Sequence, residues 1–211
     1  MTAPLEATAS PCATYSLDVD GLIADFLAGA FAYIAAQGGG SYSDKDATAW
    51  RVSGSLASDS DRALFQYFVD APASYGDLPL VAGALEGIQA LKRTGARIVV
   101  ASHAPLGALP YRQAWLDRHQ IPYDDILVSP NAKVECLEKY ASEGPILFID
   151  DDPGTAKTLG LPRSQVGLLV VKGDLPRSNL PHNQLTIDSW SEIESFIHLA
   201  QTLAEPDPLE L

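Results

Sequence analysis

The chain has 211 residues, of which 46% are hydrophobic and 19% are charged, a composition typical of a globular protein that buries a full core. Its formal net charge is −13, which argues against a nucleic-acid polymer or an anionic membrane surface as the main partner. An anionic substrate would therefore need a local positive site, supplied by a metal ion, a lysine or helix N-termini.

No segment has the pattern of a targeting signal or a membrane anchor. Residues 1–13 lack the basic stretch and the long apolar run of a secretory signal. The longest apolar stretch, Phe26–Ala36, is about half as long as a bilayer-spanning helix. We therefore expect a cytoplasmic protein without a membrane partner, in which Cys12 and Cys136 stay reduced. A homodimer is compatible with the sequence, which leaves the oligomeric state open.

The first third of the chain has the pattern of one strand followed by helices. Thr14–Val19 has the apolar, β-prone residues of a buried strand. Residues 24–80 show no clear strand but three helical patterns: Ala24–Gln37, a helix capped by Ser43 or Asp44, and a helix capped by Asp59 or Ser60 that ends before Pro72.

After residue 80, helices and strands alternate. The predicted strands are 96–102, 125–129, 145–150 and 166–171. The predicted helices are 83–95, 110–119, 131–140, 153–160 and a last one from Ser189 or Ser191 to about Leu203. This alternation indicates a parallel sheet covered on both faces. The predicted fold is therefore α/β, with a Rossmann-like core from residues 13–23 and 82–204 and an inserted helical cap from 24–81.

Three of the predicted strands end in acidic or hydroxyl side chains. The first is followed by Asp18 and Asp20, the second ends at Ser102, and a later one ends at Asp150 and Asp151. Ligands of parallel sheets bind at the carboxyl ends of the strands, so these side chains should share one crevice. Two carboxylates roughly 4 Å apart repel by about 4 kcal/mol at an effective dielectric near ~20, so protons or a cation must relieve them. Clustered carboxylate oxygens suit Mg²⁺ together with a substrate phosphate.

These residues resemble the four motifs of the haloacid dehalogenase (HAD) superfamily, in the expected order. "DVDGLIADF" from Asp18 resembles the first motif, and the strand ending in Ser102 resembles the second. Lys133 stands where the third motif has its lysine, and "LFIDDDP" from Leu147 resembles the fourth. The helical insertion after the first motif resembles a small cap of the C1 type. The resemblance covers roughly residues 17–160 and implies a HAD phosphatase core.

The sequence is also similar to the 5′(3′)-deoxyribonucleotidases of this superfamily. It shares most of their first motif, the helix start "GALEGIQAL" from Gly83, and the paired aspartates of the fourth motif. It departs from their pattern at Leu22-Ile23, at Asp152, where the family has an arginine before the proline, and at His103, where the family tends to have a serine. Substrate choice lies in the cap, so the resemblance leaves the substrate open.

The resemblance implies a phosphatase mechanism with named roles. Asp18 would be the nucleophile that forms an aspartyl-phosphate, and Asp20 would protonate the leaving group and then activate water. Lys133 and Ser102 would bind the phosphate, and His103 is a further candidate for substrate contact. Mg²⁺ would be held by the aspartates of the first and fourth motifs: by Asp18, the backbone carbonyl of Asp20 and Asp150, and by Asp151 either directly or through a water molecule.

The expected substrate is a small phosphorylated metabolite, in the favoured interpretation a nucleoside 5′-monophosphate and in particular a deoxyribonucleotide. The alternatives are the same chemistry on a sugar phosphate or phosphoglycolate, a phosphotransferase in which a sugar hydroxyl replaces water, and a non-catalytic binding protein. The mutually repelling acids argue against the last. Arg112 or Arg163 could help to bind phosphate, and the sequence does not choose between them. Aromatic residues of the cap could stack a base: Trp50, Phe65, Tyr67 and Phe68.

Overall fold

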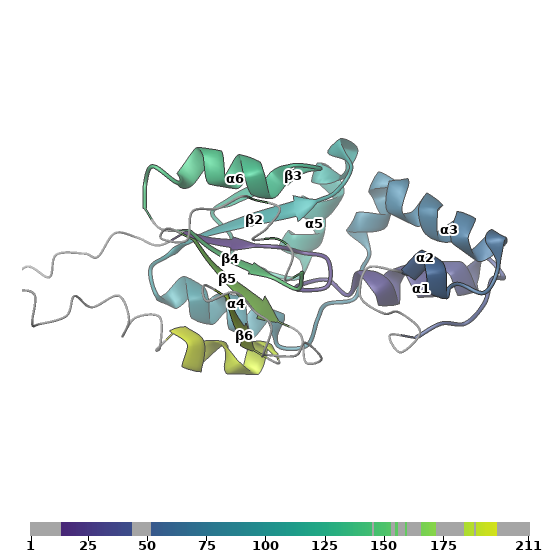
Figure 1. The fold of residues 1–211 in the computed structure, drawn as a ribbon, viewed down its shortest axis with the longest axis horizontal. Coiled ribbons are helices and arrows are strands. Elements are labelled where there is room, and N and C mark those ends of the chain that lie inside the picture. The colour runs from purple at the N-terminus through teal and green to yellow at the C-terminus, as the bar shows by residue number, and fades with distance from the viewer. Residues whose placement is uncertain are drawn as a thin grey trace, which may run out of the picture.

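A computed structural model describes residues 14–43, 52–144, 146–152, 155, 159, 166–171, 184–187 and 189–197. Within these residues the chain forms a six-stranded sheet with the order β3-β2-β1-β4-β5-β6 (Figure 1). The strands are β1 (Thr14–Leu17), β2 (Arg97–His103), β3 (Asp125–Ser129), β4 (Ile146–Asp150), β5 (Val166–Val171) and β6 (Gln184–Ile187). Neighbouring strands all pair in parallel, which confirms the predicted α/β class and Rossmann-like core.

The register of the central strands determines where the polar residues meet. β1 lies between β2 and β4, with Leu17 paired to Val100 on one side and to Ile149 on the other. Asp18 follows Leu17 and therefore lies at the level of Asp150, and its N–H donates to the Ile149 carbonyl (3.0 Å). The carboxyl ends of the two strands thus carry their aspartates side by side.

Helices cover both faces of the sheet, as expected for parallel strands. Figure 1 shows α6 above the sheet, and below it α4 together with residues 189–197, called here the C-terminal segment. Their bounds are α4 (Ala84–Arg93), α5 (Leu109–Arg118), α6 (Ala132–Tyr140) and the 3-10 helices η3 (Leu106–Ala108) and η5 (Trp190–Glu192). Residues of α6 share one buried cluster with β2 and β4, whereas α4, α5 and the C-terminal segment pack into the larger cluster.

Trp190 ties the C-terminal segment to the loop that follows β1. Its indole N–H donates to the Leu22 carbonyl (2.8 Å), and the side chain is almost completely buried. Its ring lies against Gly87 of α4, where a Cβ would overlap the ring. The C-terminal segment therefore helps to fix the loop that carries the first motif.

The helices of the predicted cap lie beyond the carboxyl ends of the strands (Figure 1). They are α1 (Phe26–Ala36), α2 (Val52–Ser55), α3 (Asp59–Asp70) and the 3-10 helix η2 (Pro72–Gly76). The ring of Phe26 packs edge-on against Phe65 and Phe68, which joins α1 to α3. The division into a core and a cap at residues 24–81 stays a prediction.

Two side chains cap the long helices of this region. Asp25 caps α1 by accepting a hydrogen bond from the Ala28 N–H (2.9 Å). Ser58 caps α3 by accepting one from the Asp61 N–H (3.1 Å), so the prediction of Asp59 or Ser60 as the cap is wrong. The reason is backbone geometry: Ser58 has the extended conformation that a capping residue needs, and Asp59 is already helical. The predicted cap Asp44 lies outside the described residues.

In the part of the chain that the structure describes, no helix is both long enough and apolar enough to cross a membrane.

Candidate active site

The carboxyl ends of β1 and β4 bring three buried aspartates together. One carboxylate oxygen from each of Asp18, Asp150 and Asp151 lies within 4.8 Å of the others. The oxygens of Asp150 accept hydrogen bonds from the Thr155 hydroxyl (2.7 Å) and the Asp152 N–H (2.9 Å). Burial, followed by the charge of Asp150, raises the pKa of Asp18 well above its usual range. The cluster offers the hard oxygen donors and the excess negative charge that a divalent cation would satisfy.

The ammonium group of Lys133 lies between two of these aspartates. Its Nζ is 2.6 Å from Asp150 Oδ2 and 3.1 Å from Asp18 Oδ2. Burial alone would lower the pKa of Lys133, but the charges of Asp18 and Asp150 outweigh burial and raise it. Lys133 lies in the first turn of α6, directly after β3, so the crossover from β3 to β4 brings it to the site. It stays protonated and offsets part of the negative charge of the cluster.

A tight turn after β1 carries the chain past the aspartates. The Ala24 N–H donates to the Val19 carbonyl (2.8 Å), which closes the turn. Gly21 has a φ of +83°, and a Cβ at this position would overlap the carboxylate of Asp151. The glycine of the first motif is therefore required both by the backbone conformation and by the close approach of Asp151.

Asp20 forms a buried ion pair with Arg112 of α5. Arg112 Nη2 lies 2.6 Å from Asp20 Oδ1, and the guanidinium carbon lies 4.9 Å from the centre of the Tyr75 ring in η2. Burial raises the pKa of Asp20, and the charge of Arg112 opposes that shift. The side chain of Asp20 thus has one oxygen held by a cation that is itself packed on an aromatic ring.

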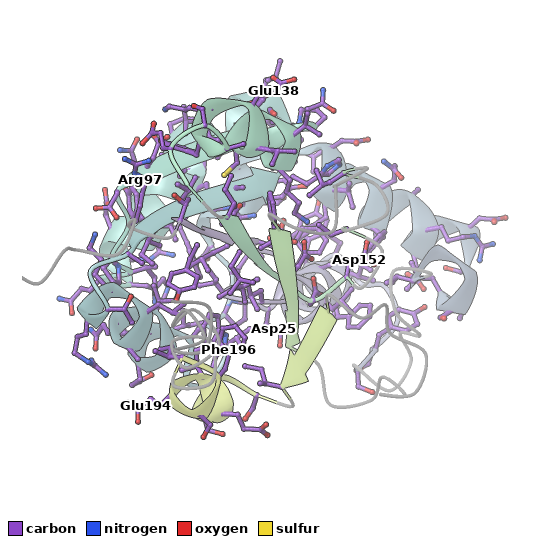
Figure 2. All side chains as sticks on the ribbon, turned by 60° about the vertical axis from the view of Figure 1, so that its left-hand side comes forward. Asp25, Arg97, Glu138, Asp152, Glu194 and Phe196 are labelled. Atoms are coloured by element: carbon purple, nitrogen blue, oxygen red, sulfur yellow. The ribbon has the colours of Figure 1, made fainter. Side chains whose placement is uncertain are left out.

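A cavity of about 320 Å³ opens beside these groups, at the lower end of the size range of small-molecule sites. Its lining residues are Asp18, Asp20, His103, Pro130, Asn131, Ala132, Lys133, Val134, Asp152, Thr155 and Leu159. His103 is exposed at the end of β2, whereas Ser102 is completely buried. The Ser102 hydroxyl has no hydrogen-bond partner among the described residues. Figure 2 shows Asp152 near the carboxyl ends of the strands and Arg97, which begins β2, at their opposite ends.

The structure brings all the predicted site residues to one edge of the sheet: Asp18, Asp20, Ser102, His103, Lys133, Asp150 and Asp151. The aromatics that sequence reasoning offered as base readers are less well placed. Phe65, Tyr67 and Phe68 do not line the cavity, and Trp50 lies outside the described residues. Arg163 also lies outside them.

Sequence reasoning missed two contacts of this site. Arg112 does not line the cavity and pairs with Asp20, and the Thr155 hydroxyl donates to Asp150. For Arg112 the sequence does hold a signal, because it shares a helical stripe with Ala108, Trp115 and Leu116, all buried. A charged residue in an otherwise apolar stripe indicates a buried partner. No comparable pattern points to Thr155.

The sequence model of the family described as "5′ nucleotidase, deoxy (Pyrimidine), cytosolic type C protein" matches residues 13–203. The chain belongs to this family. The match begins just before β1 and runs past every predicted site residue. This nucleotidase-family chain is therefore a HAD-type phosphatase, an enzyme whose substrate is a small phosphorylated molecule. No curated protein sequence matches it.

Solved structures show the same fold at low sequence identity. A HAD-family hydrolase from Deinococcus radiodurans R1, with bound phosphate and sodium, is 16% identical, with a TM-score of 0.59 over 93% of this chain and 99% of that one. The HAD-hydrolase YfnB from Bacillus subtilis, bound to magnesium, is 16% identical, with a TM-score of 0.59 over 90% and 100%. The L-2-haloacid dehalogenase from Xanthobacter autotrophicus is 14% identical, with a TM-score of 0.54 over 88% and 98%. These similarities establish the fold of the nucleotidase-family chain.

Proposed function

We propose that this phosphatase hydrolyses nucleoside 5′-monophosphates, with deoxyribonucleotides as the preferred class and Mg²⁺ as the cofactor. The observation that carries the proposal is the family match over residues 13–203, which includes both the site and the region 24–81 that we propose to be a cap. The cavity of about 320 Å³ beside Asp18 supports a small-molecule substrate. The net charge of −13 supports a cation at the site, because an anionic substrate must approach a negatively charged protein.

We propose that Asp18, Asp150, Asp151 and the backbone carbonyl of Asp20 hold the Mg²⁺. The donor set fits this ion, since it consists of hard oxygen atoms and the three carboxylates lie within 4.8 Å of one another. The magnesium in the structure of YfnB, which has the same fold, supports this choice. A bound Mg²⁺ would draw negative charge from the substrate phosphate and so ease attack by an anionic nucleophile.

In the first proposed step, a carboxylate oxygen of Asp18 attacks the phosphorus atom of the substrate. The bond between phosphorus and the nucleoside oxygen breaks, and the carboxyl proton of Asp20 passes to that leaving oxygen. The product on the enzyme is an aspartyl-phosphate at Asp18. Lys133 and the Ser102 hydroxyl, which has no hydrogen-bond partner within the described part of the chain, would stabilise the phosphate oxygens while charge develops on them.

In the second proposed step, a water molecule attacks the phosphorus atom of this intermediate. Asp20, now ionised, accepts a proton from the water, and the bond between phosphorus and the Asp18 oxygen breaks. Inorganic phosphate leaves, and Asp20 is protonated again for the next cycle. The same two steps serve a sugar phosphate equally well, so the choice of substrate has to be measured.

The test is phosphate release with Mg²⁺ from a panel of deoxy- and ribonucleoside 5′-monophosphates, sugar phosphates and phosphoglycolate. We expect kcat/KM to be highest for one or two deoxynucleotides. The Asp18→Asn variant is the negative control, because it keeps the shape of the site and lacks the nucleophile. A preference for sugar phosphates would overturn the proposed substrate, and an Asp18→Asn variant with wild-type rates would overturn the proposed nucleophile.

A further inference from the structure

We infer that Arg112 is a positioning residue for this reaction: its ion pair fixes the carboxyl group of Asp20 in the orientation that serves the leaving group. The inference rests on the proposed function, in which Asp20 acts first as the acid and then as the base. Arg112 would thus join the residues that support the reaction, although it lies in α5, a helix that carries none of the four motifs.

The ion pair restrains one oxygen of Asp20 and leaves the other for the reaction. Arg112 Nη2 lies 2.6 Å from Asp20 Oδ1. The Asp20 side chain is 11% exposed and lines the cavity, whereas the Arg112 side chain is fully buried and does not line it. Arg112 therefore reaches the cavity only through Asp20. With Oδ1 held, Oδ2 is the oxygen that can give a proton to the leaving group and take one from water.

Arg112 is itself held in place by Tyr75 of η2, in the segment between α3 and α4. Its guanidinium lies over the Tyr75 ring, and the Tyr75 hydroxyl donates to the Val69 carbonyl (2.9 Å). Another neighbour of that ring is Phe26 of α1, with 5.7 Å between ring centres. A continuous series of contacts thus runs from Phe26 through Tyr75 and Arg112 to Asp20.

A purely structural role explains Arg112 poorly. Its Nε and Nη1 atoms are buried without a hydrogen-bond partner among the described residues, which is unfavourable. The rest of its helical stripe is apolar: Ala108, Trp115 and Leu116 are buried around it. A hydrophobic side chain of similar length would fill the same space at a lower free-energy cost of desolvation. What such a side chain cannot do is restrain the carboxyl group of Asp20.

The test uses the dependence of each step on the leaving group. A nucleoside alkoxide needs a proton as it leaves, so Arg112→Met should lower kcat/KM for the preferred nucleotide by about 100-fold, the lower range for general acid catalysis. The anion of 2,4-dinitrophenol leaves without a proton, so kcat/KM for 2,4-dinitrophenyl phosphate should stay within about threefold of wild type. The second step still needs a base, so kcat for this ester should fall and a burst of dinitrophenol should appear in the first turnover.

Arg118→Met is the matched control, because Arg118 lies on the same helix and donates to the Gly76 carbonyl in η2 (2.9 Å) but is exposed. It should leave both substrates unaffected. Asp20→Asn should reproduce the pattern of Arg112→Met, and the double variant should be no slower than Asp20→Asn alone, because both changes remove the same proton transfer. Circular dichroism and thermal unfolding check that each variant is folded.

Equal losses for the two substrates, or no loss for either, would overturn the inference while leaving the proposed function intact. A wild-type protein without phosphatase activity would overturn the proposed function and the inference with it. If Arg112→Met does not fold, Tyr75→Leu decides, since it removes the ring under the guanidinium and keeps the charge. Tyr75→Leu should also lower kcat/KM for the nucleotide more than for 2,4-dinitrophenyl phosphate, by a smaller factor than Arg112→Met. Equal losses of kcat/KM for the two substrates would overturn the inference.

Discussion

Gly21 is the residue at which the backbone and the proposed metal site constrain each other most directly. It has a φ of +83°, and a Cβ there would overlap the Asp151 carboxylate. Gly38 has a φ of +82°, and a Cβ there would have nothing within 4 Å, so this position isolates the backbone effect. Each change to alanine costs about 1–2 kcal/mol because the side chain disfavours the left-handed conformation. Of the two changes, the one at Gly21 also displaces Asp151.

We therefore predict that Gly21→Ala raises the Mg²⁺ concentration for half-maximal activity about tenfold, as loss of a supporting contact at a metal site does. Gly38→Ala should lower the melting temperature similarly and leave the Mg²⁺ requirement unchanged. Activity measured as a function of Mg²⁺ and thermal unfolding of both variants give the two readouts. Equal Mg²⁺ requirements in the two variants would show that Asp151 is not a ligand or that it moves freely.

The residues of the site differ in how far the sequence predicts them. Asp18, Ser102 and Asp150 lie at the ends of apolar strands, and a parallel sheet must bring such strand ends to one edge. Arg112 is different, because its partner Asp20 lies 92 residues earlier and the pairing depends on how α5 packs against η2. Pattern reasoning finds Arg112 as a cation near the site and cannot assign its partner. Long-range pairs of this kind require the packed structure.

At the scale of elements, a hydrogen-bond network on Asp61 joins the start of α3 to the loop after α1. The Tyr42 hydroxyl donates to Asp61 Oδ2 (2.6 Å), and the Gly40 N–H donates to Oδ1 (3.3 Å). Tyr42 in turn accepts a hydrogen bond from the Ala57 N–H (3.0 Å). The hydrogen bond from Tyr42 is the main cause that lowers the pKa of Asp61 below its usual range.

The lowered pKa makes the contribution of Asp61 to stability depend on pH. A carboxyl whose pKa is lower in the folded state stabilises the fold above its unfolded pKa of about 3.9, and the stabilisation is lost as the pH falls through the folded pKa. We predict that Asp61→Asn melts at a lower temperature than wild type at pH 7 and that this difference shrinks below about pH 4. Asp59→Asn is the control, since Asp59 lies in the same helical turn with an exposed side chain. If the difference in melting temperature between wild type and Asp61→Asn did not change with pH, the charge of Asp61 would not be what stabilises the network.

The elements themselves were largely predictable from periodicity. The amphipathic period of α4 is one that a helix satisfies, and β2 is a short apolar run with adjacent β-branched residues, a combination that favours a strand. The strand β6 (Gln184–Ile187) was not predicted, because four residues of mixed polarity carry no period and gain their conformation by pairing with β5. The Ser58 cap was missed by one residue for a similar reason, since adjacent Ser and Asp residues all have capping side chains.

At the scale of the whole molecule, the folded state keeps several carboxylates close together in a protein that already carries a net charge of −13. Asp18, Asp150 and Asp151 are each at most 6% exposed, and the ammonium group that contacts the first two belongs to Lys133. A cation that binds this cluster in the folded state and not in the unfolded chain stabilises the fold by mass action. The proposed Mg²⁺ site would thus also be a stability determinant.

We predict that Mg²⁺ at a hundred times its dissociation constant stabilises the fold by about 2.7 kcal/mol, which for a chain of this size raises the melting temperature by roughly 5–10 °C over the EDTA-treated protein. Added NaCl at equal ionic strength is the first control, because general screening also relieves an acidic protein. Asp151→Asn should lose most of the Mg²⁺ effect, whereas Asp77→Asn, which changes an exposed carboxylate with a 98% exposed side chain, should keep it. If NaCl raised the melting temperature as much as Mg²⁺, or if Asp151→Asn responded like wild type, the stabilisation would be screening of the whole molecule and the carboxylate cluster would not be a specific cation site.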